Sequence, residues 1–159
     1  MKSRKKRTKH IDKLKTKCSK HVPVSGTVLA IDPASLSVGY AVLDIETEDV
    51  LESGVIEAPP RSETGMRFRL IMDVIQELMD EYQPDVCGIE LITKRRTTHV
   101  TLIRSTGAVM AALAGPPLIE VDPTVWHFFA PDGYVKSDDG DAEQIARTII
   151  KLRSYTDDS

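Results

Sequence analysis

The chain has 159 residues, a net charge of -3, 41% hydrophobic residues and 28% charged residues. At roughly 150 residues per domain this predicts one globular domain, with too little chain for a two-domain kinase, a polymerase or a transporter. No run approaches the ~18 apolar residues of a membrane-spanning helix, and the basic N-terminus lacks the apolar core of a signal peptide. Two cysteines, Cys18 and Cys87, are too few for a disulfide framework. We therefore expect an intracellular protein, cytoplasmic or nucleoid-associated, with no membrane partner.

Charge is distributed unevenly along the chain. Residues 1–20 contain ten Lys or Arg and one acid, a charge of +9, so the remaining residues carry -12. Blocks of like charge usually stay disordered and often bind nucleic acid, and we identify no apolar face that would favour a membrane surface. We expect residues 1–25 to form a disordered, DNA-binding tail and linker that includes Lys5, Lys6 and Arg7. A tail that only solubilises the protein is the alternative.

Residues 26–159 are expected to form the folded domain. Apolar, β-branched runs predict strands, and the acidic residues 46–49 suit a hairpin turn, so the first three strands form an antiparallel meander. The expected strands lie at 27–31, 37–45, 50–58, 85–92 and 118–121.

Helices are expected between and after the later strands. Apolar residues recur at three- and four-residue steps from Met66 to Tyr82, which predicts an amphipathic helix. A second helix is expected at 97–114 and a third near 141–152, after a loop that carries Trp126. The order β-β-β-α-β-α-β-α predicts a three-layer α/β domain. We expect the second helix to pack on the sheet through its small residues, which are Gly107, Ala108, Ala111, Ala112 and Ala114.

Two acids stand out because of their positions. Asp32 is the first polar residue after the strand at 27–31, and Glu90 lies within an apolar strand, between Ile89 and Leu91. A carboxylate in a core strand is costly to desolvate unless a cation meets it. Hard oxygen ligands favour Mg²⁺ or Mn²⁺, and without a cluster of His and Cys zinc is disfavoured. The alternative is a cap or a buried ion pair.

The surroundings of these acids resemble a known family. Residues 30–42, AIDPASLSVGYAV, resemble the first motif of RuvC-type Holliday junction resolvases of the ribonuclease H-like superfamily, and GIE at 88–90 resembles their second motif. RSTGA at 104–108 and PTVW at 123–126 resemble later segments of that family. The resemblance implies a ribonuclease H-like fold with a five-stranded mixed sheet. It also implies phosphodiester hydrolysis with two Mg²⁺ or Mn²⁺ ions, held by Asp32 and Glu90, and no nucleotide cofactor.

The family also uses a D-x-x-D pair on its C-terminal helix, and two segments could supply it. Asp138 and Asp141 are three residues apart and would share one helix face, with Asp141 as a metal ligand. Asp158 lies nearer the family's spacing from the glutamate, and we favour it; the motif would then be incomplete at Ser159. Acids at 138 and 139 could instead only stabilise the start of a helix. Lys136 corresponds to a lysine that the family uses near the scissile phosphate; an ordinary surface lysine is equally compatible.

Basic residues after Glu90 complete the expected DNA-binding surface. Lys94, Arg95 and Arg96 form a loop that would contact phosphates, with Arg104 nearby. The resemblance implies an endonuclease that resolves four-way DNA junctions as a homodimer, with the helix at 97–114 as a candidate interface. The alternatives are a catalytically inactive DNA-binding module and a related nuclease that cuts flaps or RNA.

Overall fold

A computed structural model describes residues 2–34, 37–57, 64–92 and 100–155. Five strands form one sheet: β1 (Thr27–Pro33), β2 (Ser37–Asp44), β3 (Val50–Glu57), β4 (Val86–Glu90) and β5 (Leu118–Val121). The helices are α1 (Lys2–His21), α2 (Thr64–Tyr82), α3 (Val100–Ala112), α4 (Pro123–Phe129) and α5 (Asp138–Arg153). The expected strands are all present, with ends that differ by up to two residues.

The sheet is mixed and has the order β3-β2-β1-β4-β5. β2 pairs with β1 and β3 in antiparallel register, whereas β4 pairs with β1 and β5 in parallel register. Pro33 ends β1 without breaking the sheet, because pairing to β4 stops at Ile31 and Pro33 faces only Val38 of β2. The expected meander followed by parallel crossovers is confirmed.

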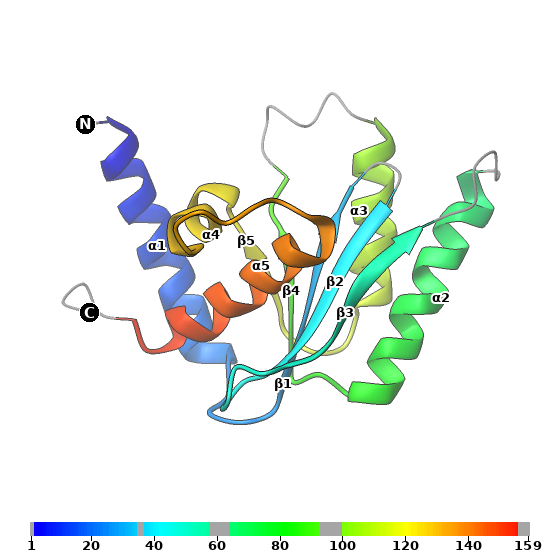
Figure 1. Cartoon of the computed structure of the whole chain (residues 1–159), viewed down its shortest axis with the longest axis horizontal. Helices are drawn as coiled ribbons and strands as arrows, with labels where there is room; N and C mark the ends of the chain where they lie inside the picture. The colour runs from blue at the N-terminus through cyan, green and yellow to red at the C-terminus, as the bar shows by residue number, and fades with distance from the viewer. Residues whose placement is uncertain (1, 35–36, 58–63, 93–99, 156–159) are drawn as a thin grey trace.

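Helices cover both faces of this sheet (Figure 1). α2 and α3 lie on one face, and α1, α4 and α5 lie on the other. Alternate residues of β1 enter the two cores: Val28 and Ala30 face α5, while Leu29 and Ile31 face α2 and α3. The three-layer α/β prediction is therefore confirmed.

The N-terminal segment differs from the expected disordered tail. Residues 2–21 form a helix whose buried side chains, Ile11, Leu14 and Cys18, recur every three or four residues. With Val22, which follows the helix directly, they join the core beside α5. Ser19 Oγ also donates a hydrogen bond to the Arg153 carbonyl oxygen, at 3.2 Å. The prediction of disorder was wrong because this apolar stripe is narrow and is surrounded by lysines.

Two expectations for the later helices are also corrected. The buried residues of α3 are Ser105, Thr106, Val109 and Ala112, whereas Gly107 and Ala111 are exposed, so most of the small-residue face points away from the sheet. Trp126 does not lie in a loop, because residues 123–129 form α4, which Pro123 begins and Asp122 caps with a 2.8 Å bond from the Thr124 N–H.

Neither cysteine forms a disulfide. Both Cys18 and Cys87 are free and buried, and burial raises the pKa of each thiol to about 12. Among the described helices, none combines the length and hydropathy that a membrane span requires.

Candidate active site

Asp32 and Glu90 lie side by side at the ends of neighbouring strands. Ala30 of β1 pairs with Gly88 of β4, and two residues further along each strand the same face carries Asp32 and Glu90. The two carboxyl groups are close enough to share a hydrogen bond, and each residue is only 7% exposed. The sequence prediction that these two acids converge agrees with this geometry.

Glycines allow α5 to lie close to this pair. A Cβ on Gly88 would overlap Ile149 of α5, and a Cβ on Gly39, which pairs with Asp32 across β1 and β2, would overlap the Asp138 carbonyl oxygen. Gly39 therefore needs to be glycine because main chain approaches it closely, whereas Gly88 makes room for the end of the Ile149 side chain. The first turn of α5 is consequently held over the end of the sheet where Asp32 lies.

The start of α5 brings two further acids to this place. Ser137 caps the helix, its Oγ accepting a hydrogen bond from the Gly140 N–H. Ser37 Oγ of β2 donates to Asp138 Oδ2 at 2.7 Å, and Tyr134 Oη donates to Asp141 Oδ1 at 2.6 Å. Asp141 is 9% exposed. Asp138 and Asp141 each accept a hydrogen bond from a neutral hydroxyl, one from β2 and one from the segment that precedes α5.

Glu90 is positioned by α4. The indole Nε1–H of Trp126 donates to Glu90 Oε1 at 3.2 Å, and the indole itself is 1% exposed. Tyr134 packs against the Trp126 ring in an edge-on arrangement, with 6.3 Å between centroids. One aromatic pair therefore contacts both Glu90 and Asp141. From the sequence, Trp126 was expected either to pack in the core or to stack on bases.

The electrostatic consequence falls on Asp32. The pKa of Asp32 is raised to about 8. The largest cause is burial; then come the charges of Glu90 and Asp141, a hydrogen bond with Glu90 and the charge of Asp138. All these influences act in the same direction. Four acids therefore create a strongly negative, water-poor site that favours either a proton or a cation.

This donor set fits a divalent metal that is completed by its substrate. Among the described residues, no three His, Cys, Asp or Glu side chains are already grouped as a ligand cage. Mg²⁺ usually takes one or two carboxylates together with water and substrate phosphates rather than a closed protein cage. Carboxylate oxygens without thiols or imidazoles are the ligands of such hard cations. The closely paired Asp32 and Glu90, with Asp141 and Asp138 nearby, satisfy this requirement.

A small pocket adjoins Glu90 on the side of α3. Its lining residues are Pro33, Glu90, Leu91, Ile92, Leu102 and Thr106. The buried hydroxyls of Ser105 and Thr106 have no hydrogen-bond partner within the described part of the chain. Leu91 and Ile92 of the pocket directly precede the expected basic loop in the chain, and Lys94, Arg95 and Arg96 are outside the described residues.

The remaining predicted residues lie at different distances from the site. Lys136 is exposed, with its Nζ 5.9 Å from the centroid of the Trp126 ring, so it belongs to the rim of the site. Arg104 is exposed on α3. Lys5 and Lys6 are exposed on α1, and Arg7 lies over the Phe128 ring at 4.4 Å.

The two candidate D-x-x-D segments have different outcomes. The structure brings Asp138 and Asp141 to Asp32, although spacing favoured Asp158. Asp158 lies outside the described residues. Sequence reasoning missed Tyr134 and Ser37 as partners of the acids. The only signal for Tyr134 was its position seven residues before Asp141, and Ser37 carried no signal because its contact joins residues 101 positions apart.

Comparisons with known proteins agree with this architecture. A RuvC from Thermus thermophilus, solved in complex with a Holliday junction substrate, superposes with a TM-score of 0.66 at 19% identity, covering 77% of this chain and 91% of that one. The yeast mitochondrial Holliday junction resolvase Ydc2 gives a TM-score of 0.61 at 15% identity, covering 91% and 92%. At these identities the likeness shows the fold, which is the predicted ribonuclease H-like one.

Sequence comparisons identify the family to which the chain is similar. The crossover junction endodeoxyribonuclease RuvC of Finegoldia magna is 29% identical over 130 residues, 79% of each chain. That of Syntrophomonas wolfei is 34% identical over 102 residues, 60% of this chain and 59% of its own length. The model of the family "Crossover junction endodeoxyribonuclease RuvC" matches residues 28–122, a range that includes Asp32 and Glu90 and ends before α5. Because this match spans more than half of the chain, the protein belongs to the RuvC family of crossover junction endodeoxyribonucleases.

Proposed function

We propose that this protein is a divalent-metal-dependent endonuclease that resolves Holliday junctions by hydrolysing phosphodiester bonds. The observation that carries the proposal is the convergence of Asp32, Glu90, Asp141 and Asp138 in one buried, negative site within a RuvC-family chain. The named function of the relatives, crossover junction endodeoxyribonuclease, supports branched DNA as the substrate.

Asp32, Glu90 and Asp141 are the proposed metal ligands, with Asp138 as the further acid, and Mg²⁺ or Mn²⁺ as the ions. When bound, the metal supplies positive charge that activates water and stabilises the charge developing on the phosphate. Trp126 and Tyr134 hold Glu90 and Asp141 through hydrogen bonds, so they act as positioning residues. Lys136 is the proposed contact to a phosphate of the incoming strand; its exposure and its position over the Trp126 ring support this role.

Junction resolution requires two cuts, and we propose that a two-fold homodimer provides them. Support comes from the face of α3 that the sheet leaves uncovered. Along it, Val100, Ile103 and Met110 are 57%, 41% and 37% exposed, beside exposed Gly107 and Ala111. Apolar side chains next to small residues on a helix allow a second helix to approach closely. A second copy of this chain is the proposed occupant, and sedimentation of wild type and Ile103→Glu tests it; a monomeric wild type refutes it.

The function is tested with a synthetic four-way junction and Mg²⁺ or Mn²⁺. We expect paired, symmetric nicks that disappear with EDTA and in Asp32→Asn and Glu90→Gln. Glu77→Gln is the matched control, because Glu77 is exposed on α2. Binding of the junction without cleavage would identify an inactive DNA-binding module. Equal cutting of flaps, duplex or an RNA–DNA hybrid would contradict specificity for junctions.

A further inference from the structure

Several cations in the N-terminal half of α1 are exposed to solvent. Of the basic residues in the helix, Arg4, Lys5, Lys6 and Lys9 are exposed, and within the described part of the chain none of these four forms an ion pair. The first turn of α1 contains no acid. Positive charges at a helix N-terminus oppose the helix dipole and cost stability. Helix stability therefore does not explain why these charges lie here.

The helix is fixed against the domain, so these charges have a defined place. Ile11, Leu14 and Cys18 anchor its middle in the core, and nearer the N-terminus the Arg7 guanidinium stacks over Phe128 of α4 at 4.4 Å. α4 is also the helix whose Trp126 donates to Glu90. One short helix thus connects the N-terminal half of α1 to the active site.

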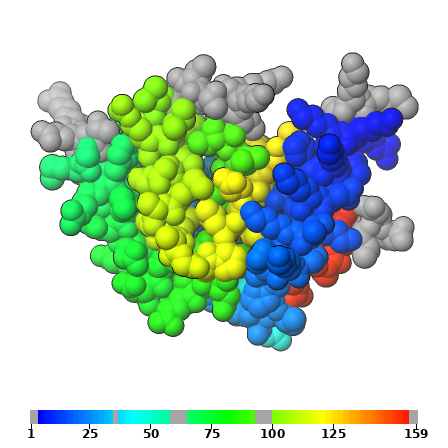
Figure 2. Space-filling view, turned by 180° about the vertical axis from the view of Figure 1, so that it is seen from behind, coloured from blue at the N-terminus to red at the C-terminus, as the bar shows by residue number. Residues whose placement is uncertain are grey.

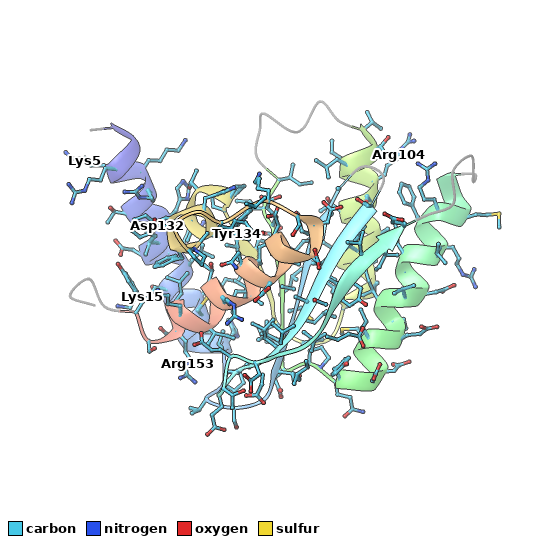
Figure 3. The ribbon with its side chains drawn as sticks, viewed as in Figure 1. Lys5, Lys15, Arg104, Asp132, Tyr134 and Arg153 are labelled. Carbon is cyan, nitrogen blue, oxygen red and sulfur yellow. The ribbon has the colours of Figure 1, made fainter. Side chains whose placement is uncertain are left out.

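The two halves of α1 lie at different distances from the active site. α5 begins at the site and, at 1.5 Å per residue, extends about 24 Å to Arg153. The contact of Ser19 with Arg153 places the C-terminal end of α1 at that far end. Figure 3 accordingly shows Lys15 nearer Arg153, and Lys5 beyond the level of Tyr134 at the other end of the helix. Seen from behind, α1 forms one border of the face that β5 and α4 occupy (Figure 2).

From these observations we propose that the N-terminal half of α1, with Arg4, Lys5, Lys6 and Lys9, binds the phosphate backbone of a duplex arm adjoining the cleavage site. This inference rests on the proposed function for the identity of the anion. α1 lies outside the range of the family match, which covers residues 28–122. Together with Arg7 and Lys136, these four residues extend the positive charge from the rim of the active site to the N-terminal end of α1.

The test compares two triple substitutions of equal charge in the full chain. Lys5→Gln, Lys6→Gln and Lys9→Gln change the N-terminal half; Lys13→Gln, Lys17→Gln and Lys20→Gln change exposed lysines of the C-terminal half. Dissociation constants for a four-way junction are measured across a range of salt, without divalent metal. We expect the first triple to weaken binding about tenfold or more and to reduce the salt slope by about 3, while the second reduces it by less than about 1.

Several outcomes would overturn the inference. If the N-terminal triple variant keeps the wild-type salt slope, α1 does not bind the DNA. If both triple variants lose equal affinity for the junction, the positive charge of α1 attracts DNA without a defined site. If the N-terminal triple variant loses wild-type binding to phosphatidylserine vesicles while its DNA binding is unchanged, the surface binds a membrane instead. The proposed function fails separately: wild type that never nicks the junction refutes it, while the difference between the two triples would still support the α1 surface.

Discussion

The Asp138 carbonyl oxygen lies directly against Gly39, the residue that pairs with Asp32 across β1 and β2. A single missing side chain therefore sets how closely α5 approaches the sheet. The approach brings the charges of Asp138 and Asp141 within reach of Asp32. This one contact therefore links the pairing of β1 with β2 to the position of α5.

Gly39→Ala should separate the acids of the site. The new Cβ would overlap main chain that cannot rotate away, so the start of α5 must shift. We expect cleavage to fall at least tenfold and the free energy of unfolding to fall by about 1–3 kcal/mol. Junction cleavage and chemical denaturation measure these effects. In Gly65→Ala, where a Cβ meets nothing within 4 Å, activity should stay unchanged; equal losses in both variants would contradict the steric explanation.

Neutralising the acids of α5 one at a time should identify which of them are needed for cleavage together with Asp32 and Glu90. Asp141→Asn is expected to reduce cleavage by two to three orders of magnitude, and Asp138→Asn by a smaller factor, because the electrostatic effect of Asp141 on Asp32 is the larger. Asp139→Asn removes the same charge from the same helix turn and serves as the control. Full activity in Asp141→Asn together with a severe loss in Asp158→Asn would favour the C-terminal alternative.

The central acids were predictable from sequence because their signal is local. Asp32 follows an apolar run and Glu90 interrupts another, so burial of a charge could be inferred without the fold. Parallel pairing of β1 with β4 then places them together. The meander and the crossovers were equally local, because each strand and each helix has its own apolar periodicity.

Tertiary contacts explain what sequence reasoning missed. The position of α5 depends on Gly39, about a hundred residues away, so spacing alone did not show that Asp138 and Asp141 lie near Asp32. The apolar stripe of α1 was not recognised among its many charged residues, because its significance depends on α5, against which it packs. The hydrogen bonds from Trp126 and Tyr134 likewise depend on where α4 and α5 pack.

Tyr134→Phe should weaken metal binding more than the chemical step. The substitution removes the 2.6 Å hydrogen bond that holds Asp141 and keeps the ring that packs against Trp126. Losing such a supporting bond typically reduces metal affinity by about 10- to 100-fold. We expect the Mg²⁺ concentration for half-maximal cleavage to rise by this factor, with the maximal rate reduced less. Tyr82→Phe removes a 3.0 Å bond to Glu52 and is the control; a similar shift there would show a general effect on the fold.

Asp32→Asn should abolish cleavage and yet stabilise the metal-free protein. The pKa of Asp32 is about 8 in the fold against 3.8 for an ordinary aspartate, so the native state holds a proton that the unfolded chain releases. Stability must therefore fall as pH rises from about 4 to 8, and this loss remains at higher pH. The asparagine has no charge to desolvate beside Glu90, so we expect it to raise the free energy of unfolding by roughly 1–3 kcal/mol near pH 8, and by little near pH 4.

Denaturation in EDTA between pH 4 and 9 measures this difference. Asp44→Asn is a control of opposite sign: hydrogen bonds from Thr47, led by its backbone N–H, lower the pKa of Asp44, so its charge stabilises the fold above that pKa. That variant should lose stability at neutral pH, where Asp32→Asn gains it. Added Mg²⁺ should stabilise wild type, because binding to the native state shifts the unfolding equilibrium, and should stabilise Asp32→Asn much less. Equal stabilisation of both proteins by Mg²⁺ would mean that the metal binds elsewhere.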